Sequence, residues 1–220
     1  MLSEIFSGKC PVCSGASALN EPVCSDCKEM LVPYTHFCGK CGFPITKAGA
    51  FCYRCRGKIS KRITNIYALY HYNKYVRSII LQMKFHYNIR LNYTLKHLIN
   101  LPNFLTKYDG IEIVPSHFLR RMVRFYHPAD VIGKYVAYKL NIKVMHHLKR
   151  VRYTAFQSHI SKSERHVNVQ DAFICKKYNK NIKNILLIDD VFTTGATINQ
   201  CVKALYDAGA RRIDVLVFAK

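Results

Sequence analysis

The sequence predicts an α/β protein in which helices flank a parallel β-sheet, with a small cysteine-rich module ahead of it. Two apolar segments, residues 185–188 and 213–218, have strand character, and the segment between them has helical character. Strand, helix and strand in that order indicate a parallel crossover. Cysteine is unevenly distributed, because eight of the ten residues of this type precede Arg56. With 220 residues, half of them hydrophobic, the chain can bury one ordinary core and support one small satellite unit.

The satellite unit is a fourfold repeat of Cys-x-x-Cys in residues 10–55, where each pair begins fourteen residues after the one before. Each pair places two thiolates on one tight turn, and two such turns complete the tetrahedral sulfur shell that Zn²⁺ prefers. Eight cysteines therefore suit two structural ions, and we expect consecutive pairs, not interleaved ones, to share an ion. An all-sulfur shell argues against a catalytic ion with an open water position. The expected ligands are Cys10, Cys13, Cys24, Cys27, Cys38, Cys41, Cys52 and Cys55.

Two units are predicted, a zinc-binding module in residues 1–62 and an α/β domain in residues 63–220. The first unit has few large apolar residues, so its fold should depend on metal. In the second, the final helix is expected over residues 195–208. Hydrophobic patterning predicts the earlier elements as a strand at 66–70, a helix at 76–83, a strand at 111–115, a helix at 128–140, a brief strand at 143–145 and a long polar loop at 150–170.

Residues 186–197 are the most informative segment, because a strand is followed by two acids, a turn of small residues and a helix start. At the carboxyl end of a parallel strand, such a turn can direct several backbone N–H groups at one anion, and the helix dipole adds to the attraction. The carboxylates of Asp189 and Asp190 repel a phosphate, so their expected partners are sugar hydroxyls or a metal ion. A phosphate site beside a site for two hydroxyl groups matches a ribose 5-phosphate. No Gly-Lys-Ser/Thr follows, so the segment is not a Walker loop; an ordinary helix cap is the other interpretation.

This segment resembles the phosphoribosyl pyrophosphate signature of type I phosphoribosyltransferases. The resemblance implies a phosphoribosyltransferase-type parallel sheet, with Asp189 and Asp190 as the catalytic pair that binds the ribose hydroxyls. From end to end, the chain resembles the ComF/GntX group of competence-related proteins, which carry a double zinc ribbon ahead of such a domain. Lys84-Phe85 and Val114-Pro115 are further matches. The resemblance also implies that the turn holds the 5-phosphate, through Val191, Thr193, Thr194, Gly195, Ala196 and Thr197.

By the same resemblance, the loop at residues 150–170 corresponds to the mobile flap that covers the ligand in these enzymes. It would bring Lys162 or Arg165 over a pyrophosphate, and a solvated surface loop is its other interpretation. The sequence departs from the family pattern at residues 121–128, which lack a glycine that relatives carry. Close approach of the backbone to a pyrophosphate needs that glycine, so the ribose phosphate half of the site carries the fuller motif.

The formal charge of +21 exceeds what solubility needs, and such a field attracts polyanions. Single-stranded DNA binding combines a basic groove with aromatic rings on which bases stack. Residues 70–75, the edge of the ribbon and residues 120–127 each mix these two chemistries, and core aromatics beside solvated lysines are the alternative for each. The expected nucleic-acid contacts are Arg54, Arg56, Arg120, Arg121, Arg124, Phe125 and Tyr126.

Two functions remain open at this point. The first is a cytoplasmic factor for natural transformation that binds incoming single-stranded DNA and phosphoribosyl pyrophosphate or a related sugar phosphate, with a DNA-uptake helicase or membrane channel protein as partner. The second is an active phosphoribosyltransferase of nucleotide salvage, in which Mg²⁺ accompanies the phosphoribosyl pyrophosphate. Ligand binding has more support than transfer, since no pocket for an acceptor base can be read from the sequence. No apolar stretch is long enough to cross a bilayer, so any association with the inner membrane is expected to be peripheral.

Overall fold

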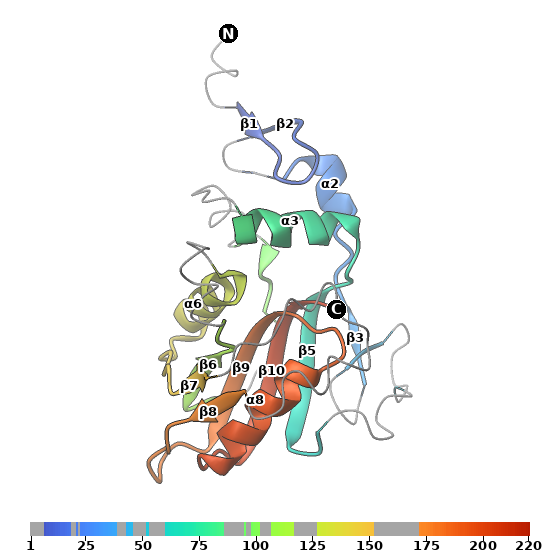
Figure 1. Ribbon diagram of the computed structural model, residues 1–220. Coiled ribbons are helices and arrows are strands. Elements are labelled where there is room, and N and C mark those ends of the chain that lie inside the picture. Colours follow the sequence, from blue (N-terminus) through green and yellow to red (C-terminus); the bar gives the residue numbers. More distant parts are fainter. Residues whose placement is uncertain are drawn as a thin grey trace.

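The computed structural model describes residues 7–18, 21, 23–38, 43–45, 52, 60–85, 95, 98–101, 107–116, 127–151 and 172–220. Within these residues, a cysteine-rich part of short elements precedes an α/β part (Figure 1). The first part comprises β1 (Ser7–Lys9), β2 (Ala16–Ala18), α2 (Ser25–Glu29), β3 (His36–Phe37) and β4 (Pro44–Ile45). The second comprises β5 (Ile63–Tyr70), α3 (Lys74–Phe85), β6 (Gly110–Ile113), α6 (Pro128–Leu140), β7 (Leu148–Arg150), β8 (Phe173–Cys175), β9 (Asn184–Val191), α8 (Ala196–Asp207) and β10 (Arg212–Ala219).

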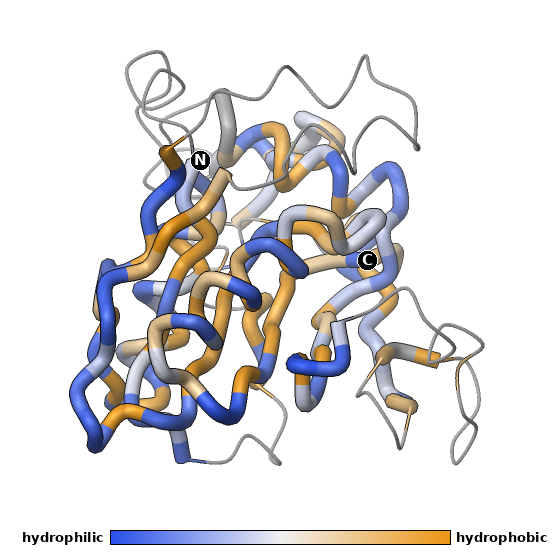
Figure 2. Tube along the Cα trace, turned by 60° about the horizontal axis from the view of Figure 1, so that its bottom comes forward, coloured by the Kyte–Doolittle hydropathy of each residue, from blue (hydrophilic) through white to orange (hydrophobic). Residues whose placement is uncertain are grey.

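The main sheet has the strand order β5-β10-β9-β6 in the described part of the chain, and all neighbouring strands run parallel. Strand β9 leads through α8 into its sheet neighbour β10, with Ile185 opposite Ile213. This arrangement confirms the parallel crossover and the α/β class predicted from residues 185–218. Figure 2 shows the strands as largely hydrophobic and many of the connecting loops as hydrophilic.

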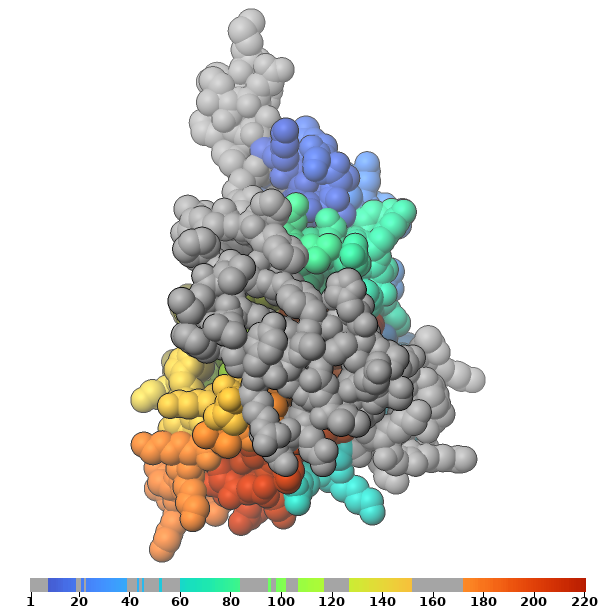
Figure 3. Space-filling model, viewed as in Figure 1, coloured from blue at the N-terminus to red at the C-terminus, as the bar shows by residue number. Residues whose placement is uncertain are grey.

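The segment between the second and third cysteine pairs runs along the outer edge of β5. Tyr34 donates its backbone N–H to the Leu69 carbonyl at 2.9 Å, and His71 donates to the Val32 carbonyl at 2.9 Å. These bonds cover an edge strand whose backbone groups would otherwise be open to pairing with another chain. The β1–α2 segment lies against α3 (Figure 3), where Ser78 Oγ donates to the Pro11 carbonyl at 3.1 Å.

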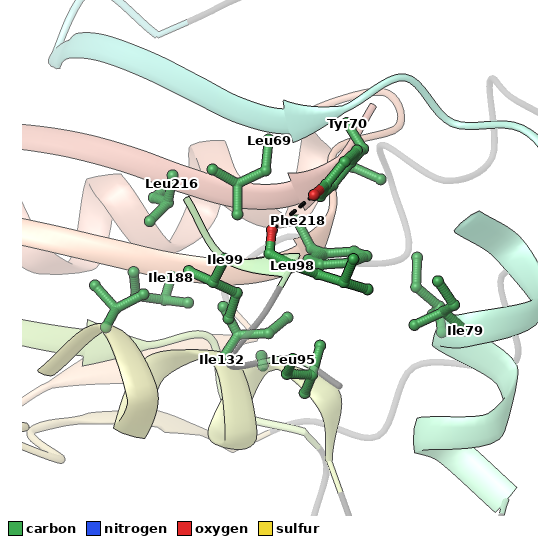
Figure 4. Packing of buried hydrophobic residues seen from close by; sticks show 14 of the residues in the cluster. Leu69, Tyr70, Ile79, Leu95, Leu98, Ile99, Ile132, Ile188, Leu216 and Phe218 are labelled. Atoms are coloured by element: carbon green, nitrogen blue, oxygen red, sulfur yellow. Dashed lines mark hydrogen bonds between the residues drawn. The ribbon is translucent and has the colours of Figure 1, made fainter. Parts of the chain in front are cut away.

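Strand residues alternate between the two faces of the sheet, and helices cover both faces. Ile188 of β9 belongs to the cluster that includes Ile79 of α3 and Ile132 of α6 (Figure 4). Its neighbour Leu187 belongs to the opposite cluster, with Val202 of α8. A parallel sheet buried on both faces requires nearly continuous apolar strands, which explains why residues 185–188 carry no polar side chain.

Two helices have the bounds that the sequence indicates. Helix α6 spans residues 128–140 as expected, because Pro128 suits the first turn and Asn141 ends the helix in the left-handed conformation with φ of 53°. Helix α8 begins after Gly195, which has φ of 81°, and ends at Asp207. Gly195 therefore sets the point at which the chain changes from turn to helix.

Two features near residue 145 differ from the sequence prediction. The prediction of a brief strand at residues 143–145 is wrong. Val144 forms only an isolated bridge with Ile111, and the chain turns at His146, whose φ is 57°. The strand forms later, as β7, and pairs antiparallel with β8 in a two-stranded sheet that the sequence analysis did not predict. Most of the expected loop at 150–170 lies outside the described residues.

Candidate functional sites

Four cysteines of the first two pairs form a compact sulfur cluster. The Sγ atoms of Cys10, Cys13, Cys24 and Cys27 all lie within 4.8 Å of one another, and Cys13 Sγ is 3.7 Å from Cys24 Sγ. A tetrahedral ion with Zn–S bonds of about 2.3 Å separates its sulfur ligands by about 3.8 Å, so the donor set fits Zn²⁺. The cluster brings the first and second pairs together, as consecutive pairing predicts, and supports a structural zinc site there.

Local structure and electrostatics both suit a bound cation there. Cys24 precedes α2 and Cys27 lies within it, so one helical turn places both sulfurs. Burial raises the pKa of Cys27 well above its usual value, and the sulfurs of Cys24 and Cys13 raise it further. Burial opposes ionisation of Cys10 as well, but hydrogen bonds from the backbone of Cys24, Cys13 and Val12 lower its pKa to about 7. Four thiolates at this spacing repel one another, and a divalent cation removes that repulsion.

The last two cysteine pairs are described only in part. Cys38 and Cys52 are both buried, and the backbone N–H of Cys52 donates to Cys38 Sγ at 3.3 Å. Cys41 and Cys55 lie outside the described residues, so the second zinc site stays a prediction.

The β9–α8 turn presents unpaired backbone donors at a helix N-terminus. Among the described residues, the N–H groups of Thr193, Thr194, Gly195 and Thr197 have no acceptor. Thr193 is exposed and Thr194 is half-buried, whereas Gly195 is buried. A Cβ atom on Gly195 would lie 2.8 Å from Cζ of Phe192, so this position accepts only glycine without a shift of the ring. Free N–H groups and the positive end of a helix dipole together favour an anion at this turn.

The two acids occupy the end of β9, and strand alternation separates their side chains. Asp189 is 8% exposed and accepts the backbone N–H of Asp190 at 2.8 Å. It lies on the α8 side of the sheet, and its charge adds to burial in raising the pKa of Cys201. Asp190 is half-buried and accepts the backbone N–H of Val191 at 2.8 Å. Asp190 is therefore the more accessible of the two carboxylates.

Three residues near this turn were not found from the sequence. Ser116 follows the end of β6, which neighbours β9, and its Oγ atom is buried without a hydrogen-bond partner in the described residues. Phe43 contacts Phe192 edge to face, and Lys220 Nζ lies 4.3 Å from the Phe192 ring centroid. Ser116 adjoins the Val114-Pro115 match, which was the available signal, whereas no sequence pattern indicates Phe43 or Lys220.

Several expected site residues cannot be placed. The flap residues Lys162 and Arg165 lie outside the described residues, as do the expected nucleic-acid contacts Arg54, Arg56, Arg120, Arg121, Arg124, Phe125 and Tyr126. Within residues 70–75, Tyr70 is buried and donates its hydroxyl to the Leu98 carbonyl at 2.8 Å (Figure 4), so it belongs to the core. No helix among the residues that the structure describes has the length and apolar character needed to span a bilayer.

Comparison with known proteins agrees with this architecture. A model of the double zinc ribbon domain family matches residues 1–56, the part that precedes the α/β part. Over 230 residues it is 26% identical to competence protein F of Haemophilus influenzae, covering all of both chains. It is 25% identical over 217 residues to DNA utilization protein YhgH of Salmonella typhimurium and of Escherichia coli, covering 94% of this chain and 95% of each relative. The similarity to competence protein F thus extends along the whole chain and confirms the resemblance drawn from its motifs.

Proposed function

We propose that this protein is a DNA-uptake factor that binds single-stranded DNA and carries a binding site for phosphoribosyl pyrophosphate. The names of its relatives, competence protein F and DNA utilization protein, support a role in handling DNA. The formal charge of +21 supports a polyanionic partner. The proposed site for phosphoribosyl pyrophosphate rests on one observation, the set of free N–H groups at the β9–α8 turn beside two carboxylates.

The turn and the acids suit different parts of one ligand. A 5-phosphate at the turn would accept hydrogen bonds from the N–H groups of Thr193, Thr194 and Gly195, at the positive end of α8. Asp190, the more accessible carboxylate, would accept hydrogen bonds from ribose hydroxyls, and Asp189 would fix the strand end from behind. Lys162 and Arg165 would approach the pyrophosphate from the flap. Mg²⁺ prefers oxygen ligands and would neutralise the pyrophosphate, for which the Asp190 carboxylate is a suitable neighbour.

Isothermal titration with phosphoribosyl pyrophosphate and Mg²⁺ tests this site directly. Asp190→Asn keeps the shape of the side chain and removes its charge, so it should lower affinity by at least tenfold. Asp207→Asn is a matched control, because Asp207 is exposed at the far end of α8. Equal affinity of the Asp190→Asn variant and the wild type would contradict the proposed sugar contact.

The DNA half is tested by fluorescence anisotropy with a labelled oligothymidylate. Affinity should fall steeply with salt, because binding to phosphates releases counterions. In the source organism, deletion of the gene should lower transformation frequency, and the wild-type gene should restore it. Unchanged transformation in the deletion strain contradicts a role in DNA uptake.

The second candidate is an active phosphoribosyltransferase, which the acid pair at the end of β9 also favours. Carboxylates beside a ribose would stabilise positive charge developing on the sugar during transfer. The measurement is pyrophosphate release from phosphoribosyl pyrophosphate in the presence of a panel of bases. Release that depends on one base and is lost in Asp190→Asn supports the enzyme, and absence of release with every base supports a binding protein.

A further inference from the structure

An exposed aromatic ring flanked by arginines lies at the end of the sheet remote from the β9–α8 turn. The ring of Tyr206, near the end of α8, is 36% exposed. The guanidinium carbon of Arg62 lies 4.8 Å from its centroid, and that of Arg211 lies 5.2 Å from it. We call Arg62, Tyr206 and Arg211 the Arg-Tyr-Arg platform. Cation–π contacts of this length place a guanidinium group over the face of a ring.

The fold itself brings the three side chains together. Arg62 directly precedes β5 and Arg211 directly precedes β10, and these strands are parallel neighbours with Ile213 opposite Ile63. Arg211 donates a guanidinium N–H to the Ala210 carbonyl at 3.0 Å. Its backbone N–H donates to the Lys183 carbonyl at 2.9 Å, which adds the start of β9 to the same surface. The platform is therefore fixed by sheet register and not by a flexible loop alone.

The surroundings of the platform are basic, and its guanidinium groups are not neutralised by ion pairs in the described residues. Within the described residues, no carboxylate forms an ion pair with Arg62, Arg211 or Lys183, whereas Arg212 pairs with Asp214 at 3.2 Å. The exposed acids nearby are Asp207 and Asp109, and Asp109 is already occupied by the backbone N–H groups of residues 183 and 184. The exposed basic residues at this end are Lys61, Arg62, Lys183, Lys203 and Arg211. Figure 2, which turns this end of the molecule forward, shows its loops as hydrophilic.

We propose that the Arg-Tyr-Arg platform is a binding surface for single-stranded DNA, with a base stacked on Tyr206 and the flanking phosphates on Arg62 and Arg211. An exposed ring between cations is the arrangement that sequence-tolerant single-strand binding uses. An acidic protein would use the cations but would have no need of the ring, so the ring favours nucleic acid. This inference rests on the DNA-binding half of the proposed function and assigns its surface.

The platform and the sugar-phosphate turn occupy opposite ends of the same strands. Strand β9 runs from Asn184, beside the platform, to Val191, beside the turn. Seven rises of about 3.3 Å place these ends about 23 Å apart. Both ligands can therefore bind at once, and phosphoribosyl pyrophosphate should not displace the DNA.

The test measures anisotropy of a labelled oligothymidylate with three variants and the full-length protein. Tyr206→Ala should weaken binding by about fivefold to tenfold or more, and Tyr206→Phe, which keeps the ring, should bind like the wild type. Arg62→Ala combined with Arg211→Ala should weaken binding further and reduce the slope of log K against log salt by about 1.4, since each single-strand phosphate contact contributes about 0.7.

The matched control removes two exposed charges at the other end of the sheet. Lys74 and Arg77 lie on α3, and Lys74 Nζ is 5.1 Å from the Tyr75 ring centroid, so this site also combines a cation with an aromatic ring. Lys74→Ala combined with Arg77→Ala should change the affinity less than threefold. An equal or larger loss in this control overturns the platform, as does a Tyr206→Ala variant that is folded and binds like the wild type.

A wild-type protein that binds no oligonucleotide at low salt overturns DNA binding as a whole. A wild-type protein that binds, together with platform variants that bind equally well, overturns only the location. Crosslinking of a bromouracil-containing oligonucleotide to the peptide that contains Tyr206 supports the location without any variant, and crosslinking only elsewhere contradicts it.

Discussion

The ring of Phe43 meets the ring of Phe192 edge to face, with centroids 6.4 Å apart and planes inclined by 83°. The Phe43 carbonyl accepts the backbone N–H of Cys38 at 2.6 Å, and Phe192 belongs to the β9–α8 turn. Lys220 Nζ lies 3.1 Å from the Phe43 centroid and 4.3 Å from the Phe192 centroid, so one ammonium group contacts both rings. The second half of the cysteine-rich part is thereby packed against the turn to which we assign the 5-phosphate.

Phe43→Ala should loosen that turn. Phe43 is buried, and loss of a buried phenyl group costs about 3–5 kcal/mol of stability in a typical core. The unsupported Phe192 ring should then move, and hydrogen exchange should become faster at the two hydrogen-bonded N–H groups that flank the turn, those of Phe192 and Asn199, which donate to the Ala219 and Gly195 carbonyls. Phe37→Ala is the control, because Phe37 lies on the same hairpin but its ring packs on Tyr67, with centroids 5.9 Å apart. Exchange at the turn that rises equally in both variants would show general destabilisation and contradict the specific contact.

Gly195→Ala should abolish binding of phosphoribosyl pyrophosphate. The residue has φ of 81°, and a left-handed conformation costs a non-glycine residue about 1–2 kcal/mol. The new Cβ atom would also lie 2.8 Å from Cζ of Phe192, so the ring beside the anion site would have to move. Gly209→Ala is the matched control at the other end of α8, where φ is 116° but the nearest atom beyond the adjoining residues, Tyr178 Cβ, would lie 4.0 Å from the new Cβ. Both variants should lose stability in urea unfolding, and only Gly195→Ala should lose the ligand in calorimetry.

The sequence was sufficient to predict elements whose cause is local. Helix α6 was predicted at residues 128–140 because its proline start and apolar spacing lie within the segment itself. Strands β9 and β10 were predicted because burial on both faces makes them largely apolar, with Asp214 as the one polar residue within 213–218. The two-stranded β7–β8 sheet was not predicted, since its partners are three-residue strands far apart in the chain and the buried Glu112 carboxylate fixes its start. That carboxylate accepts the backbone N–H groups of His147 and Leu148 at 3.0 and 3.2 Å.

The candidate sites also separate into those with a local cause, which could be predicted, and those that depend on distant segments, which could not. The first zinc site follows from cysteine spacing, because two short turns supply all four ligands. The contact of Phe43 with Phe192 and the convergence of Arg62 and Arg211 on Tyr206 could not be predicted, because each depends on how distant segments meet across the sheet. Periodicity identifies which residues are buried but does not identify their tertiary partners.

Cys27→Ser should remove one zinc ion from the purified protein. The four sulfurs of the first site lie within 4.8 Å of one another, and loss of one ligand leaves an incomplete shell. Because α2 and the β1–β2 hairpin have little apolar mass of their own, the thermal unfolding temperature should also fall. Cys175→Ser is the control, since Cys175 lies in β8 and outside both expected sites. Metal analysis by mass spectrometry should show zinc reduced in the first variant and unchanged in the second, and equal zinc in both contradicts the assigned ligands.

Tyr178→Phe should make stability less dependent on alkaline pH. Tyr178 donates its hydroxyl to buried Glu112 at 2.9 Å and lies 3.6 Å from Cys175 Sγ, with the His147 ring stacked 5.1 Å away. Burial, and then the charge of Glu112, raises the pKa of Tyr178 above its usual value near 10. The unfolded chain releases this proton near pH 10 while the folded chain keeps it, so the stability from Tyr178 is complete below pH 10 and is lost as pH rises above it.

In urea unfolding at pH 8, the Tyr178→Phe variant should be less stable by about 1.5–3 kcal/mol, the range for a hydrogen bond to a charged group. Between pH 10 and 11, its free energy of unfolding should fall less steeply than that of the wild type, so the difference between the two proteins shrinks. The Tyr138→Phe control alters a ring that is 80% exposed and should reproduce the wild-type curve. A difference between Tyr178→Phe and the wild type that stays constant from pH 8 to pH 11 would show that Tyr178 ionises equally in the folded and unfolded chains.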